Sequence, residues 1–346
     1  MDEYSQLKPL WHLDRMDDLR KGRTTKPVHV QLILSDLCNQ DCHFCAYRMS
    51  AGLSTELFGT AKTHNPNRKI RTDKAEEIIN DCAEMGVKAI QFTGGGEPTV
   101  HPDYLKLFAL AQHLGMKTAL VTNGIRLDPS HHSIQGMDWI RVSIDAGMAS
   151  TYAKIRRVTE NHWNKAWHNI AALRDFGGNL GVGFVVTTDN YREIDLCAIK
   201  CKDSGVKTMR VGAVFSSEGI HYYGDRIDRI CDSIRQAKDI YDSKDFEIID
   251  LFGRRLSDLE HGSPDEEFCG YQYFTMYIGA DLNVYRCCNT AYTTRGIVGN
   301  LENIRLRDLV PNYAPFDART CKFCQFMGQN QAINSALRVP ADVDFV

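Results

Sequence analysis

The chain has 346 residues, of which 43% are hydrophobic and 25% charged, and its net charge is −3. These proportions are ordinary for a globular protein, and the slight negative charge excludes a global basic field that would attract nucleic acid or an anionic membrane. Residues 1–13 are polar and mixed, without the apolar core of a signal peptide, and no apolar run approaches the length of a membrane span. We therefore expect a cytoplasmic protein without a membrane partner.

Strands and helices alternate along most of the chain. After an N-terminal arm of residues 1–27, apolar runs predict strands at residues 28–34, 88–93, 117–122, 139–144, 180–187 and 206–214. Helical patterns follow these strands at residues 73–86, 102–114, 150–157, 162–176, 193–204 and 226–241. Such alternation implies a parallel sheet with right-handed crossovers. Because a full barrel needs eight units, six predict an α/β fold with an open, partial (β/α)6 TIM-like barrel over residues 28–245.

Twelve cysteines are many for a chain expected in a reducing compartment, where disulfides are rare. Three of them stand within eight residues directly after the first predicted strand, at Cys38, Cys42 and Cys45. A second group occupies the C-terminal third, at Cys269, Cys287, Cys288, Cys321 and Cys324. The other four lie on predicted helices, where we expect small buried hydrophobic side chains. Clustered thiols in a reduced protein indicate metal sites.

The first group has the spacing C-x3-C-x2-C. Three close thiolates can hold three irons of a [4Fe–4S] cluster and leave the fourth iron without a protein ligand, free to bind a small molecule. Half of a zinc site is the alternative reading. No fourth ligand follows at the spacing of a zinc knuckle, however, and His43 lies inside the loop itself. The pattern therefore favours a cluster with an open iron.

This cysteine loop, with Phe44 before its last cysteine, resembles that of the radical S-adenosylmethionine (SAM) superfamily. The position agrees as well, because the loop follows a first strand and precedes a helix. The resemblance implies that Cys38, Cys42 and Cys45 hold a [4Fe–4S] cluster, that SAM binds its fourth iron, and that Phe44 lies near the adenine. It also implies reductive cleavage of SAM to methionine and a 5′-deoxyadenosyl radical, which takes a hydrogen atom from the substrate.

A glycine-rich turn, Gly94 to Pro98, follows the second predicted strand. Glycine lets a backbone approach a ligand closely, although a glycine run can also simply form a tight turn. The turn is similar to the GGEP turn of radical SAM proteins. That resemblance implies that Gly95, Gly96 and Glu97 help to bind SAM through its amino group.

Polar residues at later strand ends complete the resemblance. It assigns Asn123 and Ser143 to the ribose or carboxylate of SAM, and Arg156 to neutralising a carboxylate. Functional side chains gather at the carboxyl ends of strands in this topology. The alternatives are local hydrogen bonds that cap strand ends for Asn123 and Ser143, and a surface position for Arg156.

The C-terminal third predicts a hairpin, at residues 273–278 and 283–286, followed by a C-x2-C knuckle. This arrangement resembles the small auxiliary-cluster domain called twitch, the shortened relative of the SPASM domain. The resemblance implies an auxiliary domain over residues 246–330 and a tail over 331–346. It assigns a second [4Fe–4S] cluster to Cys269, Cys287, Cys321 and Cys324. Four thiolates would also suit structural zinc, and Cys288 could take the place of Cys287.

These features imply a radical SAM enzyme that carries out an isomerisation or an oxidation. A reductase, flavodoxin or ferredoxin would supply the electron. The short N-terminal arm is too small for the leader-binding domain that many peptide-modifying relatives carry, which favours a small molecule or nucleotide base as substrate. The specific hypothesis, from family likeness, is an amino-acid-adduct thymine base in viral DNA, modified in the host cytoplasm. A peptide maturase and a sugar or cyclitol dehydrogenase are the enzymatic alternatives.

DNA is a further candidate partner. Basic residues at 20–26, 62–71 and 254–255 could contact phosphates. Four aromatic residues could stack on an extruded base, namely Tyr47, Phe58, Tyr222 and Tyr223. Taken singly, each is more simply a solvated charge or a core aromatic residue. Outside enzymes, the alternative is an iron–sulfur or zinc protein of electron transfer or regulation, against which the open iron position argues.

Overall fold

The structure, a computed structural model, describes residues 5–58, 66–309 and 314–338. Its strands are β1 (His29–Ile33), β2 (Ala89–Thr93), β3 (Lys117–Thr122), β4 (Trp139–Ser143), β5 (Asn179–Val186), β6 (Thr208–Ala213), β7 (Glu247–Asp250), β8 (Thr275–Ile278), β9 (Asn283–Tyr285) and β10 (Ile297–Asn300). They form one sheet in the order β10-β9-β8-β1-β2-β3-β4-β5-β6-β7. The pairs from β8 through β1 to β7 are all parallel, whereas β9 and β10 pair antiparallel.

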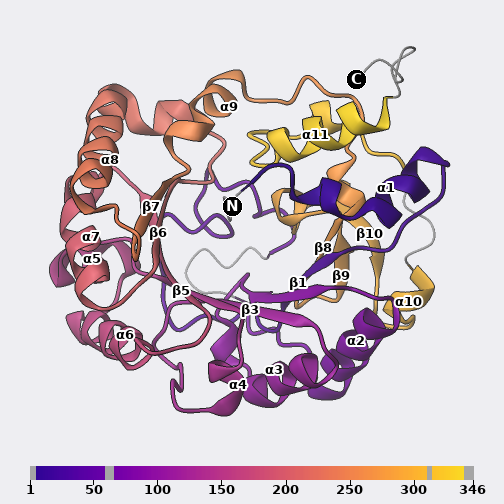
Figure 1. Cartoon of the computed structure of the whole chain (residues 1–346), viewed down its shortest axis with the longest axis horizontal. Helices are drawn as coiled ribbons and strands as arrows, with labels where there is room; N and C mark the ends of the chain where they lie inside the picture. The colour runs from indigo at the N-terminus through magenta and orange to yellow at the C-terminus, as the bar shows by residue number, and fades with distance from the viewer. Residues whose placement is uncertain (1–4, 59–65, 310–313, 339–346) are drawn as a thin grey trace.

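The longer helices surround this sheet as an outer row (Figure 1). The helices are α1 (Leu13–Arg20), α2 (Thr72–Glu84), α3 (Tyr104–His113), α4 (His132–Gln135), α5 (Ala149–Arg156), α6 (Glu160–Ala172), α7 (Ile194–Asp203), α8 (Ile227–Tyr241), α9 (Leu256–His261), α10 (Leu306–Leu309) and α11 (Met327–Leu337). Short 3-10 turns occur between several of them. No helix among the described residues is long and apolar enough to cross a bilayer.

The core lies between the strands and this outer row. Both faces of a parallel sheet are covered, so its strands read as apolar runs rather than as strict alternation. Strand β1 shows this pattern, because Val30 to Ile33 are all buried. The helices contribute one apolar stripe each; in α8 the stripe consists of Ile230, Ile234 and Ala237.

The predicted open α/β barrel is confirmed. Strands β1 to β6 and the helices α2, α3, α5, α6, α7 and α8 occupy the twelve predicted positions to within a few residues. The parallel sheet does not stop at residue 245, however. Strand β7 extends it beyond β6, and β8 pairs with β1 at the other side. Residues 246–330 therefore contribute strands to both edges of the barrel sheet.

Helix α11 crosses residue 331, the expected start of the tail, and runs to Leu337. This helix lies beside α1 of the N-terminal arm (Figure 1). The Nη2 of Arg20 donates a hydrogen bond to the carbonyl of Ala336 at 2.8 Å. Residues 339–346 of the expected tail lie outside the described residues.

Candidate active site

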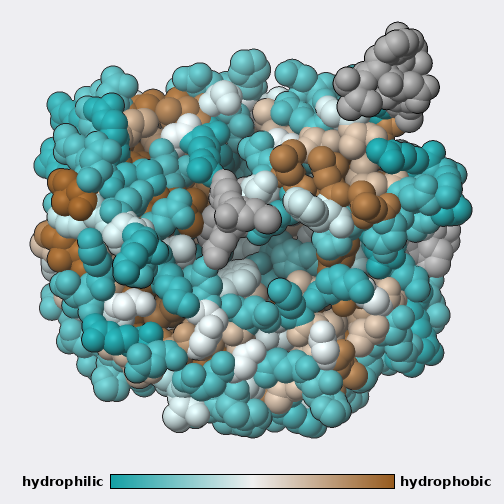
Figure 2. Space-filling model, viewed as in Figure 1, coloured by the Kyte–Doolittle hydropathy of each residue, from teal (hydrophilic) through white to brown (hydrophobic). Residues whose placement is uncertain are grey.

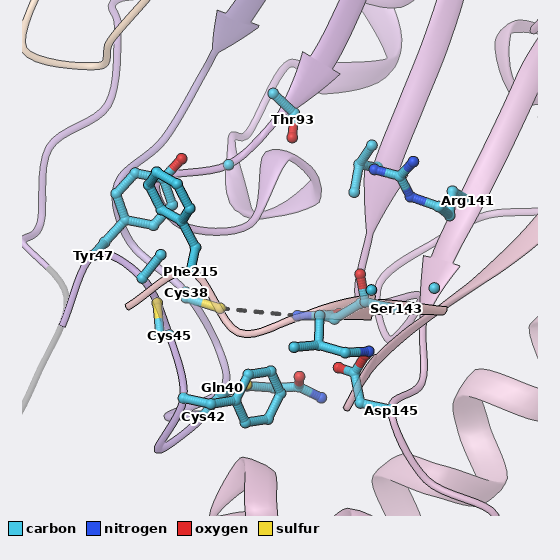
Figure 3. A pocket seen from close by; sticks show the side chains of 18 of the residues that line it. Cys38, Gln40, Cys42, Cys45, Tyr47, Thr93, Arg141, Ser143, Asp145 and Phe215 are labelled. Atoms are coloured by element: carbon cyan, nitrogen blue, oxygen red, sulfur yellow. Dashed lines mark hydrogen bonds between the residues drawn. The ribbon is translucent and has the colours of Figure 1, made fainter. Parts of the chain in front are cut away.

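A cavity of about 410 Å³ opens between the cysteine loop and the inner face of the barrel strands. Figure 2 shows one face of the molecule hollowed at its centre. In the close view, Cys38, Cys42 and Cys45 lie on one side, while Arg141 and Ser143 of β4 lie across from them (Figure 3). All seven residues assigned to SAM line this cavity: Phe44, Gly95, Gly96, Glu97, Asn123, Ser143 and Arg156.

The end of α5 holds the cysteine loop in place. The backbone N–H of Asp41 donates to the carbonyl of Arg156 at 3.1 Å, and that of His43 donates to the carbonyl of Ile155 at 3.0 Å. The carbonyls in the last turn of a helix lack partners within the helix, so they are available to a neighbouring loop. The Arg156 guanidinium adds a bond to the Gln40 side-chain oxygen at 2.5 Å.

Arg156 is buried, with 3% of its surface exposed, so the surface alternative for this residue is wrong. Its guanidinium forms an ion pair with Asp145, whose carboxylate also accepts a bond from the backbone N–H of Val185 at 2.7 Å. Asp145 adopts the left-handed conformation, with φ 57°, which Asp tolerates better than most residues. Arg156 lines the cavity, but its guanidinium already binds within the protein. Contact with SAM stays a prediction.

The glycine turn packs against the chain that enters the cysteine loop. The N–H of Gly96 donates to the carbonyl of Ser35 at 3.0 Å, and that of Glu97 to the carbonyl of Leu37 at 2.9 Å. A Cβ on Gly96 would stand 2.2 Å from the Leu37 carbonyl oxygen. Glycine is therefore required here by the close approach of two backbones, in addition to any contact with SAM.

Glu97 joins the ends of β2 and β3. Only 2% of this residue is exposed, and one carboxylate oxygen accepts bonds from the Thr99 hydroxyl at 2.7 Å and the Thr122 hydroxyl at 2.5 Å. The other accepts from the N–H of Asn123 at 2.8 Å. Burial raises the pKa of Glu97, and these bonds oppose that rise. The carboxylate thus positions the strand ends around the cavity.

Asn123 reaches from its strand end to the cysteine loop. Its side-chain nitrogen donates to the Asn39 side-chain oxygen at 2.6 Å and lies 3.9 Å from the sulfur of Cys38. Ser143, in contrast, forms the end of β4 and is half-buried. Phe44 is 8% exposed and packs in the core. The SAM roles predicted for these residues stay predictions.

The half-buried thiols of the cysteine loop are protonated when no metal is bound, because desolvation disfavours the thiolate form. Burial raises the pKa of Cys42 to about 12 and also raises the pKa values of Cys38 and Cys45; the charge of neighbouring thiols adds to the rise at Cys38 and Cys42. Binding of iron must therefore release protons, since thiolates are the ligands. Three thiols in a concave, partly apolar setting fit a [4Fe–4S] cluster with one open iron.

The four C-terminal cysteines assigned to a second cluster, Cys269, Cys287, Cys321 and Cys324, line a separate small cavity of about 20 Å³. Burial raises the pKa of Cys269 and of Cys321 to about 12, and the charge of Cys287 adds to both rises. Among the described residues, no three His, Cys, Asp or Glu side chains converge on the position of a single ion. The second [4Fe–4S] cluster and structural zinc both stay predictions for this thiol group.

Cys288 does not belong to that small cavity. It lines the large one, as does Gln325, whose side-chain nitrogen lies 3.2 Å from the Cys288 sulfur. Their neighbours in the chain, Cys287 and Cys324, line the small cavity. The geometry thus favours Cys287 over Cys288 for the second thiol group.

Four of the arginines that line the cavity were not assigned to it from the sequence, among them Arg141 of β4 and Arg210 of β6. The signal was present in both strands, WIRVS and TMRVGA, where a single Arg interrupts an apolar run. Burying a charged side chain at an inward-facing strand position costs desolvation free energy, so such a residue indicates a functional role.

Comparison with known proteins now identifies the class. A family model described as the Radical SAM superfamily matches residues 32–198. This chain therefore carries a radical SAM domain. The cofactors of that superfamily are a [4Fe–4S] cluster and SAM, and the matched residues include the cysteine loop and the glycine turn.

Curated relatives share about half of the chain. The S-adenosylmethionine-dependent nucleotide dehydratase of Flammeovirga pacifica is 32% identical over 183 residues, which cover 51% of this chain and 60% of that protein. A protein of the same name from Lacinutrix mariniflava is 32% identical over 180 residues, 50% of this chain and 36% of the other. The mycofactocin maturase MftC of Mycobacterium tuberculosis is 30% identical, over 54% of this chain and 44% of that protein. The chain thus spans 60% or less of each.

Solved structures share the fold. Streptococcus suis SuiB bound to S-adenosylmethionine aligns with a TM-score of 0.63 at 17% identity, over 90% of this chain and 73% of that one. The protein anSMEcpe with bound AdoMet aligns with a TM-score of 0.59 at 15% identity, over 90% of this chain and 85% of that one. Both alignments extend well beyond residues 32–198, so the likeness includes part of the C-terminal third.

Proposed function

We propose that the chain is a radical SAM enzyme that cleaves SAM reductively and takes a hydrogen atom from a substrate held in the same cavity. One observation carries the proposal. The three thiols of the cysteine loop, the glycine turn and the polar strand ends, far apart in the sequence, line one cavity of about 410 Å³. When bound, the cluster supplies the electron for SAM cleavage, and the protein supplies binding and orientation.

The residues around the cavity divide this work. Cys38, Cys42 and Cys45 would hold the cluster and leave its fourth iron open. The turn at Gly95 and Gly96 lines the same cavity and would meet the amino group of SAM there. Apolar strand residues such as Val121, Phe184 and Val185 also line the cavity, beside arginines of β4 and β6.

The four cysteines of the small cavity would hold a second [4Fe–4S] cluster in an auxiliary domain of the twitch type. The support is that these thiols share one cavity and that the structural likeness to SuiB and anSMEcpe covers about nine tenths of the chain. A reductase, flavodoxin or ferredoxin would deliver the electrons. All twelve cysteines are free, in keeping with a reducing cytoplasm.

For the substrate, we favour a nucleotide or a nucleotide base, because the first two curated relatives are named nucleotide dehydratases. The amino-acid-adduct thymine base of viral DNA is one member of that class, and the comparisons do not single it out. The reaction on the substrate could be an isomerisation or an oxidation; the relatives' names also include a dehydratase, which keeps a dehydration among the candidates.

Intact DNA as the partner has less support. Arg68 donates a hydrogen bond to Asp36 at 2.8 Å, and Arg71 donates one to Asp73 at 2.8 Å. These basic side chains are therefore already paired within the protein. Phe58 and Tyr223 are 1% and 0% exposed and pack in the core. Part of the predicted basic stretch, at 59–65, lies outside the described residues.

A peptide substrate is the second candidate. SuiB has been solved bound to its precursor peptide SuiA, with a TM-score of 0.63 to this chain, and the relative MftC is named a maturase. Sequence identity to SuiB is only 15%, which supports the fold rather than the substrate. We therefore place this candidate after the nucleotide.

The proposal is tested by anaerobic reconstitution with iron and sulfide, followed by SAM and dithionite. Formation of 5′-deoxyadenosine is expected. Deoxynucleotides and unstructured peptides added in parallel should separate the two substrate classes, because the matching substrate should accelerate cleavage. Protein that holds its iron but forms no 5′-deoxyadenosine would rule out the activity.

A further inference from the structure

The charge on the cavity wall is unbalanced. Two carboxylates line it, Glu97 and Asp145, and both are already bonded within the protein. Five guanidinium groups line it, those of Arg48, Arg141, Arg156, Arg210 and Arg255. Arginines therefore outnumber carboxylates among the residues that line the cavity.

Arg48, Arg156 and Arg255 each have a carboxylate partner within the protein. Arg48 pairs with Asp41, Arg156 with Asp145, and Arg255 with Asp258 at 3.2 Å. Arg141 differs from them, since among the described residues its guanidinium forms no ion pair and lies over the Trp139 ring at 5.6 Å. Its charge acts on Asp145 from a distance, but that carboxylate is held by Arg156.

Sheet register brings Arg141 and Arg210 to the same inner face. Ser143 of β4 pairs with Gly183 of β5, which pairs with Arg210 of β6. Arg141 lies two residues before Ser143, and alternate residues of a strand point to the same side. The two arginines thus project from strands on either side of β5, and both line the cavity.

Glycines leave space between these arginines. Gly183, on the intervening strand, has no side chain, and a Cβ there would stand 3.6 Å from the Cδ of Arg141. Gly212, two residues after Arg210, has nothing within 4 Å of the position of a Cβ, so the space above it is open. Both glycines line the cavity. The part of the cavity above Gly183 and Gly212 thus lies between two guanidinium groups and is not filled by protein side chains.

We propose that Arg141 and Arg210 bind an oxyanion group of the substrate, a phosphate or a carboxylate, above Gly183 and Gly212. Guanidinium groups bind both kinds of oxyanion through paired, charge-assisted hydrogen bonds. That the bound molecule is the substrate rests on the proposed function. The anion site itself depends only on the cavity.

Binding to reconstituted, SAM-saturated protein tests this site. Isothermal titration with inorganic pyrophosphate and with glutarate should show binding of at least one probe. Tighter binding of pyrophosphate indicates a phosphate-bearing substrate, and tighter binding of glutarate a carboxylate-bearing one. Arg141→Gln and Arg210→Gln should each weaken the dissociation constant roughly ten-fold or more, the usual worth of a charge-assisted bond.

Two further variants distinguish a loss of the anion site from a folding defect. Gly212→Val should also weaken binding. The valine side chain would occupy the open space proposed for the anion and would leave the charge of the site unchanged. Arg235→Gln is the matched control, since Arg235 is an exposed arginine paired with Asp232 on α8, and binding should be unchanged.

The site is overturned if neither probe binds the SAM-saturated protein, or if both arginine variants bind the probes like wild type. Formation of 5′-deoxyadenosine by the same wild-type preparation is measured separately. Its absence beside intact probe binding would contradict the proposed activity and leave the anion site standing.

Discussion

Cys287 and Cys288 are neighbours in the chain but line two different cavities. Cys287 faces the small cavity with the other C-terminal thiols, whereas Cys288 faces the large cavity beside Gln325. The same division recurs at Cys324 and Gln325. The wall between the two cavities is thus one residue thick at both places, which sets the second thiol group directly behind the space proposed for the substrate.

This division predicts unequal effects of two adjacent substitutions. Cys287→Ala should lower the iron content of reconstituted protein from about eight to about four per chain, because one ligand of the second cluster is lost. Cys288→Ala should keep about eight. Iron analysis with sulfide determination measures both. Equal iron in the two variants, or a loss confined to Cys288→Ala, would contradict the assignment.

The Arg156–Asp145 pair should be essential for the cysteine loop. Arg156→Ala leaves the Asp145 carboxylate buried without its partner, which costs about 3–5 kcal/mol of unfolding free energy. It also removes the bond to Gln40 in the loop, so less iron should bind. Urea denaturation measures the free energy. The double variant with Asp145→Ala should lose less than the sum of the single losses, and additive losses would show that the pair does not act as a unit.

Glu97 should matter through the strand ends that it joins. Glu97→Ala leaves two buried donors, the Thr122 hydroxyl and the Asn123 N–H, without an acceptor. Each should lower the free energy of unfolding by about 1–3 kcal/mol. Affinity for SAM should fall at the same time, because the cavity wall shifts. Glu97→Gln keeps one acceptor oxygen and should retain part of both properties. SAM binding that is unaffected in folded Glu97→Ala protein would argue against this role.

Two glycines that line the same cavity should respond differently to alanine. Gly96→Ala places a methyl group against the Leu37 carbonyl and should destabilise the protein by about 1–3 kcal/mol, the usual cost of overpacking. Gly212→Ala meets open space and should leave the melting temperature nearly unchanged. Thermal unfolding of both variants measures the difference. A tolerated Gly96→Ala would show that the turn does not need its close contact with the cysteine loop.

Much of the fold could be read from the sequence, because apolar strands such as Val30–Ile33 and one-sided helices such as α8 carry their pattern locally. Strand β7 was missed because its four residues, EIID, form no distinct run and follow a polar segment. Its place in the sheet depends on pairing with β6, which no local pattern reports. The helix α11 depends similarly on packing against the N-terminal arm.

The candidate site was predictable where spacing along the chain fixes the chemistry, as at Cys38, Cys42 and Cys45. It was less predictable where contacts join distant segments. Arg156 contacts Gln40 across 116 residues, and Asn123 contacts Asn39 across 84. Nor could the sequence separate Cys287 from Cys288, since their difference arises from the direction in which each side chain points.

The most direct test compares cysteine variants of matched composition for formation of 5′-deoxyadenosine from SAM and dithionite. Cys42→Ala removes a thiol of the cysteine loop, whereas Cys231→Ala removes a half-buried thiol of α8 outside both groups. Wild type and Cys231→Ala should form 5′-deoxyadenosine, and folded Cys42→Ala should form none. Equal formation in Cys42→Ala, or none in wild-type protein that holds its iron, would contradict the assignment of SAM cleavage to the cysteine loop.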